Sequence, residues 1–457
     1  MDGAFREEVA AARENGELYF ASLLPEDAIN NAYENATPTR RGRIYTPAIT
    51  VWVFLSQIFS SDHSCRDAVV QLIAWMVAAG KATCSSATGA YCIARDKLPE
   101  MVCLNLVRHT CKEVEEQAPP EWNWLGHRVL DVDGSTVTMP DTPENQAEYP
   151  QMSSQKPGCG FPIMRILVVF VLSVGTVLEL AVSPYKGKRT GENSMFRALH
   201  PMVKENDVVL ADRYFAGWFD VASLRQRGVH FVIRKHQLRG TDFRTGRRLG
   251  KDDHIVTYVK PQRPKWMSVA EYESLPSELE VREVRARVCQ RGFRTKELIV
   301  TTSLLDAKVY TAEEIAKLYR RRWQAELDLR SLKIVMQMDH LRCTEPHRVR
   351  NELYMHIVGY NLIRKVIALA AMKAGKEPWQ VSFKGALQTL NRFLPMLMSG
   401  AATDTWCDEL LAAIATHEVG NRPDRVEPRL KKRRPKQYKL MQKPRKEYKT
   451  KGRKTLG

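Results

Sequence analysis

The sequence predicts a mixed α/β fold with helical regions on both sides of a strand-rich centre. Apolar residues recur at helical spacing in residues 1–125 and again in 346–420. Between them, short runs rich in Val, Ile and Leu alternate with helical segments, as expected for a sheet covered by helices. A chain of 457 residues also exceeds the usual size of a single core, so we expect several domains.

The N-terminal region, residues 1–125, is predicted to be a helical DNA-binding domain. Its clearest helix begins at Pro47, because a threonine directly before a proline is a helix-start signal. A basic loop precedes this helix at residues 37–47, and further segments keep helical spacing up to residue 117. The sequence does not single out one of these helices as the one that reads DNA.

The apolar run at residues 161–182 is predicted to be two strands rather than a membrane helix. The run is rich in Val, Ile and Leu, but Ser173, Gly175 and Thr176 interrupt its middle. Small and polar residues at that point are typical of a tight turn between two buried strands. We therefore expect a hairpin here and no membrane partner.

With that hairpin, the central region follows the order of a ribonuclease H-like fold. The segment 127–142 is expected to begin with a strand that ends at Asp133–Gly134, and the hairpin follows. Then come a helix, a strand, a helix and a strand at 191–203, 206–214, 217–228 and 229–235. Three strands followed by this alternation are the order of that mixed α/β fold. The predicted ribonuclease H-like catalytic domain covers residues 126–234 and 305–345.

An all-β insertion is predicted to interrupt this domain at residues 235–304. Three runs in the segment alternate between apolar and polar residues, which is typical of strands. Immediately afterwards, Thr311 and Glu314 have the spacing of a capping box and predict the start of a long helix. A helical C-terminal region is then expected over 346–420.

The C-terminal segment, residues 421–457, is predicted to be a basic tail. The formal net charge of the chain is +18, and residues 422–457 contain 16 Lys and Arg against three acidic residues. Such a charge excess favours a polyanionic partner, which is either nucleic acid, such as double-stranded DNA, or an anionic membrane surface. The densest run, expected to bind DNA, is Lys431, Lys432, Arg433 and Arg434. A solvated tail without a role is the alternative.

The cysteines favour a reducing compartment. There are nine of them, an odd number, and no C-x-x-C pair occurs. This argues against a disulfide framework or a zinc knuckle. The first residues are polar and helical rather than a signal peptide. We therefore expect a cytoplasmic protein.

One helical face after the insertion combines a carboxylate with cations. With about 100° per residue, four side chains fall within about 60° of arc: Tyr319, Arg322, Glu326 and Lys333. Arg320 and Arg321 point elsewhere, so only the third arginine of this run lies beside the glutamate. An exposed Arg–Glu pair on a solvated helix is the simplest alternative, and it contributes only about 0.2–0.5 kcal/mol.

Two aspartates at the ends of apolar strands make a catalytic site the better interpretation. Asp133 and Asp212 each end such a run, where an ionised side chain is costly without a partner or a task. Taken singly, each is also compatible with a turn former or a helix cap. Together with Glu326 they suit Mg²⁺ or Mn²⁺, and two such ions can serve phosphodiester chemistry.

Neighbouring carboxylates compete for these roles. Asp131 lies two residues before Asp133 and therefore shares its strand face, which makes it the main rival as first ligand. Asp133 is preferred because Gly134 allows a close approach of substrate or backbone. Glu192 is interpreted as a helix-start residue, and Asp141 as part of a turn.

Several motifs resemble those of a known family. The pattern Y-x2-R-x3-E-x6-K that ends at Lys333 resembles the YREK signature of DDE transposases of the insertion-sequence-four family. "DGSTVTMPDTPEN" at 133–145 is similar to the first-aspartate motif of that family, and "VVLADRYF" at 208–215 to the second. The resemblance extends over roughly residues 125–445.

The resemblance implies a metal-binding catalytic triad of Asp133, Asp212 and Glu326 with two Mg²⁺ or Mn²⁺ ions. It implies cut-and-paste DNA transposition, with nicking at the terminal inverted repeats, hairpin-mediated excision and strand transfer into target DNA by the 3′-hydroxyl. A homodimer in the synaptic complex is implied as well. Tyr319, Arg322 and Lys333 correspond to the residues that grip phosphates near a flipped-out base.

One departure concerns the residue that stacks on this base. Relatives can use a tryptophan in the β insertion, but residues 267–322 contain none, so Trp266 is the nearest candidate. A packing role for Trp266 within the insertion is an equal alternative. For the whole chain, the alternatives are a catalytically inactive DNA-binding relative and a structure-selective nuclease on the same fold.

Overall fold

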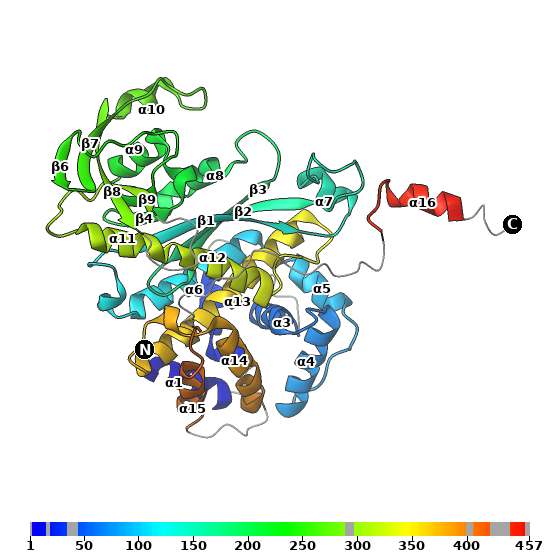
Figure 1. The fold of residues 1–457 in the computed structure, drawn as a ribbon. Helices are drawn as coiled ribbons and strands as arrows, with labels where there is room; N and C mark the ends of the chain where they lie inside the picture. Colours follow the sequence, from blue (N-terminus) through cyan, green and yellow to red (C-terminus); the bar gives the residue numbers. More distant parts are fainter. Residues whose placement is uncertain are drawn as a thin grey trace.

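The computed structural model describes residues 2–14, 19–33, 44–287, 297–398, 405–420 and 439–452. Lys431, Lys432, Arg433 and Arg434, the run in the tail predicted to bind DNA, lie outside these ranges. In the described part, a mixed sheet lies against a large group of helices (Figure 1). The mixed α/β character predicted from the sequence is confirmed.

Nine strands of the described chain form one sheet with the order β3-β2-β1-β4-β5-β9-β8-β7-β6. The strands are β1 (Val129–Thr138), β2 (Ile163–Val171), β3 (Val177–Pro184), β4 (Val208–Ala211), β5 (His230–Arg234), β6 (Arg247–Gly250), β7 (Asp253–Val259), β8 (Glu278–Arg287) and β9 (Glu297–Thr302). β1, β4 and β5 are parallel neighbours, and all other pairs are antiparallel. The parallel trio therefore lies inside the sheet.

The apolar run at 161–182 forms the antiparallel pair β2–β3, as predicted. Gly175 in the connecting turn has a φ of +73°, a conformation that glycine adopts without strain. Most side chains of β2 are buried. The run is apolar because β2 lies inside a sheet with both faces covered.

Helices fill the connections between strands and form the layer next to the sheet. The α-helices are α1 (Asp2–Glu14), α2 (Glu26–Ala32), α3 (Pro47–Phe59), α4 (Cys65–Ala78), α5 (Gly89–Asp96), α6 (Glu100–Gln117), α7 (Pro143–Glu148), α8 (Glu192–Leu199), α9 (Trp218–Gln226), α10 (Val269–Ser274), α11 (Ala312–Arg321), α12 (Trp323–Arg330), α13 (Pro346–Lys373), α14 (Phe383–Met398), α15 (Trp406–Ala415) and α16 (Arg445–Gly452). Short 3-10 turns are η1 (Tyr19–Ser22), η2 (Pro120–Trp122), η3 (His200–Met202), η4 (Arg213–Phe215) and η6 (Pro378–Gln380), and η5 (Ser331–Val335) is a π-helix. α8 precedes β4 and α9 precedes β5, in the order that the sequence predicts.

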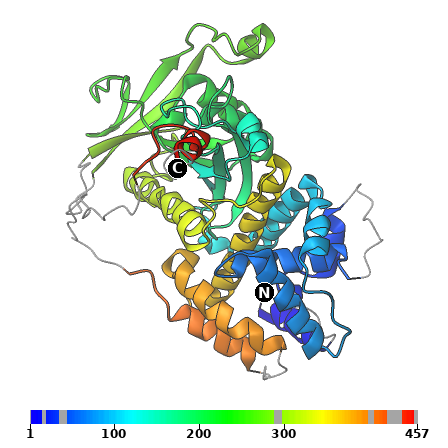
Figure 2. The same ribbon diagram turned by 90° about the vertical axis from the view of Figure 1, so that its right-hand side faces the viewer.

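The central helix α13 packs against both ends of the chain. It contacts α3 and α6 from the N-terminal region and α14 and α15 from the C-terminal region (Figures 1 and 2). Buried Asn361 donates to the Val107 carbonyl on α6, at 3.2 Å, and exchanges two hydrogen bonds with the Val177 backbone on β3. α13 is long and apolar enough to cross a membrane, but 94% of its most apolar window is buried inside the protein. We therefore interpret it as a core helix.

The single long helix expected from residue 310 onward is interrupted, so that prediction needs correction. α11 ends at Arg321, and α12 begins at Trp323 after a one-residue turn at Arg322. The Arg322 amide donates to the Tyr319 carbonyl three residues back, the tighter spacing of a 3-10 turn. Beyond α12, the chain continues as the π-helix η5. A capping residue does begin the helix, since Thr311 accepts from the Glu314 amide.

The strands of residues 235–304 extend the main sheet instead of standing apart from it. β9 pairs with β5, and β8, β7 and β6 follow in turn. A short helix, α10, also lies in this segment, which the sequence predicted to be only β-structure.

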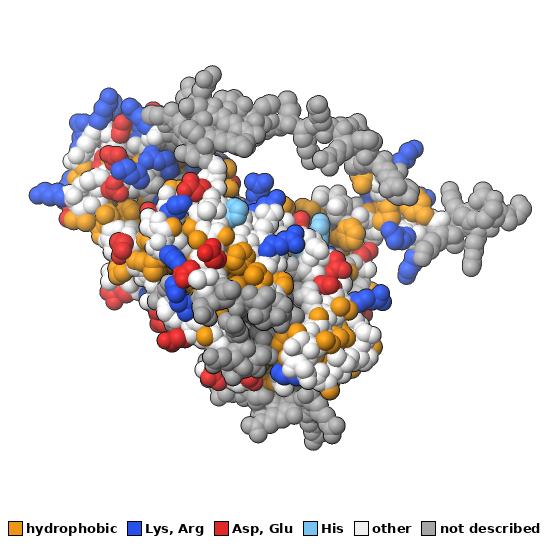
Figure 3. Space-filling view, turned by 90° about the horizontal axis from the view of Figure 1, so that it is seen from below, with side chains coloured by type: hydrophobic (Ala, Val, Ile, Leu, Met, Phe, Trp, Pro, Cys, Tyr) orange, Lys and Arg blue, Asp and Glu red, His pale blue; other side chains and the backbone are white. Residues whose placement is uncertain are grey.

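On the surface in Figure 3, Lys and Arg side chains are interspersed with Asp and Glu rather than gathered in one stripe.

Candidate active site

Two aspartates lie side by side where the parallel strands β1 and β4 meet the helical layer. Val132 on β1 is the register partner of Ala211 on β4. The next residue in each strand direction is Asp133 and Asp212, so parallel pairing places the two at the same level of adjacent strands. The predicted end of the first strand at Asp133–Gly134 is wrong, because β1 continues to Thr138. β4 does end directly before Asp212, as predicted.

Each aspartate also accepts a short local hydrogen bond. Asp133 Oδ1 accepts from the Gly134 amide at 2.9 Å. Asp212 Oδ1 accepts from the Tyr214 amide at 2.7 Å and caps the 3-10 turn η4. The capping role considered for Asp212 is therefore real. It leaves the second carboxylate oxygen open to another partner.

Glu326 comes to the same place from α12, which packs against β1. Arg322 Nη2 donates to Glu326 Oε1 at 2.7 Å. The other two arginines lie elsewhere, as the helical spacing predicts: Arg320 is exposed, and Arg321 lies 3.8 Å from Glu377. Of these three arginines, only Arg322 therefore pairs with the negative charge of Glu326.

The pKa of Asp133 depends on both of the other carboxylates. Burial raises the pKa of Asp133 to about 6, and the Arg322 guanidinium opposes this increase. The negative charges of Glu326 and Asp212 raise the pKa further. Both of these carboxylates are therefore close enough to act on Asp133, although the three residues are far apart in sequence.

Asp131, the rival first ligand, lies deeper in the protein. Its side chain is fully buried, and neither carboxylate oxygen accepts a hydrogen bond of normal geometry from a described residue. Burial raises its pKa well above the usual value, and Arg322 is the strongest opposing influence. Asp131 and Asp133 share one strand face, as predicted from the period of two.

The predicted phosphate-binding residues surround this group. Tyr319 is buried, and that burial raises its pKa to about 12. Lys333 donates to Ser135 Oγ at 3.1 Å, which places its ammonium group beside β1, two residues after Asp133. Lys333 reaches the strand from the π-helix η5, so the regular-helix spacing used for the sequence does not hold at that residue.

Trp266 lies apart from these side chains. The Arg197 guanidinium stacks over its ring at 3.6 Å from the centroid, and Phe219 meets it edge to face at 6.2 Å. The Trp266 side chain nevertheless remains 42% exposed. It joins the β segment to α8 and α9, which favours the packing alternative for this residue.

Glu192 is an additional carboxylate that the sequence did not assign to the site. It is the first residue of α8, as interpreted from the sequence. Its carboxyl group also lies directly against Gly134, where a Cβ atom would be 2.5 Å from Glu192 Cδ. The feature of the sequence that could have indicated this contact is the glycine after Asp133, because a residue without a side chain leaves room for another group.

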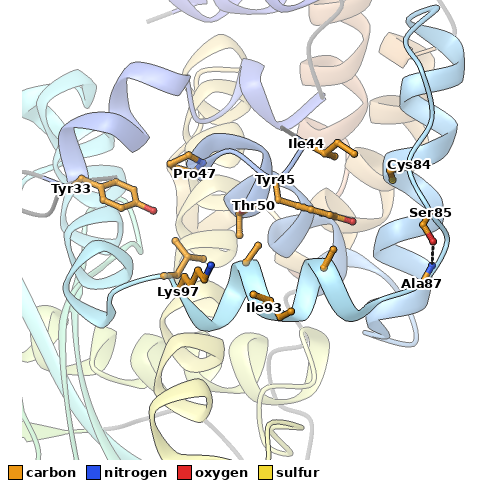
Figure 4. Close-up of a pocket in the computed structure, with 13 residues that line it drawn as sticks. Tyr33, Ile44, Tyr45, Pro47, Thr50, Cys84, Ser85, Ala87, Ile93 and Lys97 are labelled. Atoms are coloured by element: carbon orange, nitrogen blue, oxygen red, sulfur yellow. Dashed lines mark hydrogen bonds between the residues drawn. The ribbon is translucent and has the colours of Figure 1, made fainter. Parts of the chain in front are cut away.

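Two other features of the described chain lie outside this site. Asp96, Glu345 and His347 could together hold a metal ion by geometry, but Arg348 pairs with both acidic residues at this junction of α5 and α13. A cavity of about 630 Å³ lies between α3 and α5 and is lined mainly by apolar side chains (Figure 4). Neither contains Asp133, Asp212 or Glu326.

Comparison with known proteins gives the family. Residues 124–362 match the family model described as "Transposase DDE domain". The chain belongs to this transposase family. The matched range includes Asp133, Asp212 and Glu326, and enzymes of this family generally use divalent metal ions. This protein is therefore a DNA transposase.

Two relatives in sequence are transposases as well. The transposase InsG of insertion sequence element IS4 from Escherichia coli K12 is 29% identical over 332 residues, which is 70% of this chain and 71% of the relative. The putative transposase InsL of IS186A from the same organism is 34% identical over 70 residues, 15% of this transposase and 19% of the relative. A piggyBac transposase in a synaptic complex with hairpin DNA has a TM-score of 0.41 at 10% identity, with 87% and 84% of the two chains covered.

Proposed function

We propose that this transposase cuts and joins DNA with Asp133, Asp212 and Glu326 as its catalytic carboxylates. One observation carries the proposal: the charges of Asp212 and Glu326 both act on the pKa of the partly buried Asp133. Structural ion pairs also shift pKa values, but three converging carboxylates from separate elements are typical of a site with a chemical task.

The residues fit two Mg²⁺ or Mn²⁺ ions. Carboxylate oxygens are the ligands these hard cations prefer. Asp131, two residues before Asp133, is fully buried and has no hydrogen-bond partner of normal geometry for either oxygen among the described residues, so a cation nearby would stabilise its ionised form. When bound, the ions would activate the attacking oxygen and stabilise the leaving one. Asp133, Asp212 and Glu326 would hold them.

The proposed reaction has four steps at phosphorus, two hydrolyses and two strand transfers. Water attacks at the end of the element and releases a 3′-hydroxyl. That hydroxyl attacks the opposite strand, which gives a hairpin and a double-strand break. After the hairpin is opened by water, the 3′-hydroxyl attacks target DNA and joins the element to it. Every step breaks one phosphodiester bond and, apart from the two hydrolyses, forms another.

Tyr319, Arg322 and Lys333 are proposed to bind the phosphates next to the reacting one. Arg322 and Lys333 are cations within reach of the carboxylate group, since one contacts Glu326 and the other contacts Ser135. Guanidinium and ammonium groups are the usual phosphate donors of proteins. Trp266 is retained as a candidate for base stacking because part of its ring is exposed.

We also propose a division of the chain into domains. The strand order β3-β2-β1-β4-β5 with α8 and α9 supports a ribonuclease H-like domain of residues 126–234 and 305–345. Residues 235–304 would be its insertion, and 346–420 its helical C-terminal region. Residues 1–125 and the basic tail 421–457 would bind the terminal inverted repeats and the target. We further propose a homodimer in the synaptic complex and a location at the bacterial nucleoid.

The deciding experiment uses purified protein, Mg²⁺ and labelled DNA that carries the element's own terminal repeats. The wild type is expected to give nicked, hairpin and joined products. Glu326→Gln removes one proposed ligand and should abolish all of them, while binding to the same DNA remains. Cleavage without joining would indicate a nuclease, and binding alone an inactive relative. Turnover by the variant would refute the assignment of Glu326.

A further inference from the structure

Glu192 and Gly134 face each other at the edge of the proposed site. Glu192 begins α8, and Gly134 directly follows Asp133 on β1. A Cβ atom at residue 134 would lie 2.5 Å from both Cδ and Oε1 of Glu192, closer than real side chains approach. The glutamate carboxyl group therefore occupies the space that any other residue at position 134 would fill.

The Glu192 carboxylate has no direct partner among the described residues. No hydrogen bond or ion pair to it occurs in that part of the chain, although the Arg165 charge lowers its pKa. Burial raises this pKa, and the charge of Asp212 raises it further. An ionised carboxylate that is half-buried, unpaired and close to another carboxylate is costly unless a cation joins them.

Geometry brings these carboxylates to one part of the sheet. Asp133 on β1 and Asp212 after β4 lie at the same level of adjacent strands, and α12 with Glu326 packs against β1. Glu192 comes from α8, and its carboxyl group covers Gly134, the residue next to Asp133.

We propose that Glu192 is a fourth carboxylate of the metal centre and that Gly134 provides the path along which it reaches the ion. This inference rests on the proposed function, because it places Glu192 beside Asp212 in the same centre. Its oxygens would bind a divalent cation on the Asp212 side. A purely structural role, a negative charge at the start of α8, would stabilise the helix without affecting the metal.

The first test is Mn²⁺ binding to full-length Glu192→Gln, measured by isothermal titration calorimetry without DNA. Glutamine keeps the shape and removes the charge, so the dissociation constant should increase at least about tenfold. Glu144→Gln is the matched control, since Glu144 is an exposed glutamate in the first turn of α7. An unchanged affinity with a lowered melting temperature would overturn the proposal in favour of the structural role.

The second test is Gly134→Ala, alone and combined with Glu192→Gln. The alanine methyl group would displace the Glu192 carboxyl group, so the single change should also weaken Mn²⁺ binding. If the two residues act together, the double variant should bind no more weakly than Glu192→Gln. Additive losses, or an unaffected Gly134→Ala, would refute the path through Gly134.

The tests separate this inference from the proposed function. Glu326→Gln is measured in parallel for Mn²⁺ binding and for DNA cleavage. If it loses both while Glu192→Gln keeps the wild-type affinity, only the fourth carboxylate is refuted. If Glu326→Gln keeps both, the proposed catalytic site itself is wrong.

Discussion

The ionisation of Asp133 makes a quantitative prediction about stability. Burial and the neighbouring carboxylates raise its pKa from 3.8 to about 6, so the folded protein disfavours the ionised form. The penalty is absent below pH 4, where the group is protonated in both states, and is complete above pH 6. With about 1.4 kcal/mol for each pH unit, it reaches at most about 3 kcal/mol at neutral pH.

Asp133→Asn removes this penalty, because asparagine carries no charge at any pH. In Mg²⁺-free buffer at pH 7.5, the variant should therefore melt at a higher temperature than the wild type, and the difference should shrink toward pH 4.5. Differential scanning fluorimetry across this range measures it. Added Mg²⁺ should stabilise the wild type and reduce the difference, since the ion binds the folded state.

Asp27→Asn is the control for this comparison, because Asp27 is an exposed residue in the first turn of α2. It should melt like the wild type at each pH. If Asp133→Asn melts at the same or a lower temperature than the wild type at pH 7.5, with no dependence on pH, the electrostatic account of the site is refuted.

Other predictions concern the reaction and the DNA contacts. At a subsaturating Mg²⁺ concentration, wild-type cleavage should increase about tenfold from pH 5 to pH 7, because Asp133 must lose its proton before it binds the ion; a flat profile there, with DNA binding saturated, would contradict its pKa of about 6. Arg322→Ala should impair hairpin formation more than the first nick, as read from product ratios on labelled DNA; equal losses would argue against a second-strand role. Removal of residues 430–457 should weaken DNA binding and flatten its salt dependence in fluorescence anisotropy, and an unchanged slope would remove the tail from the interface.

The sequence predicts the parts of this site that depend on local pattern. Asp133 and Asp212 stand out because each ends a run of apolar residues, and strand periodicity places Asp131 on the same face. Glu326 and Arg322 are four residues apart in a helical segment, so their contact at 2.7 Å follows from helix geometry. These are relations between residues close together in the chain.

Other parts depend on tertiary structure. The contact of Glu192 with Gly134 joins the start of a helix to the middle of a strand 58 residues earlier, and no local pattern encodes it. The turn at Arg322 and the π-helix at 331–335 were missed because their residues have ordinary helix propensities. The basic run at 431–434 remains a prediction, since it lies outside the described residues.

The position of α13 has a consequence for where the enzyme cuts. Lys365 on this helix pairs with Glu113 on α6 at 2.5 Å and with Glu8 on α1 at 3.2 Å, while Asn361 bonds to β3. One buried helix thus connects the N-terminal helices to the sheet in which β1 and β4 position the aspartates. If those helices bind the repeat sequence, the distance between the DNA-binding helices and the carboxylates is fixed. Base pairs inserted between the recognised repeat and the cleavage site should then move the cut to a different position in the DNA.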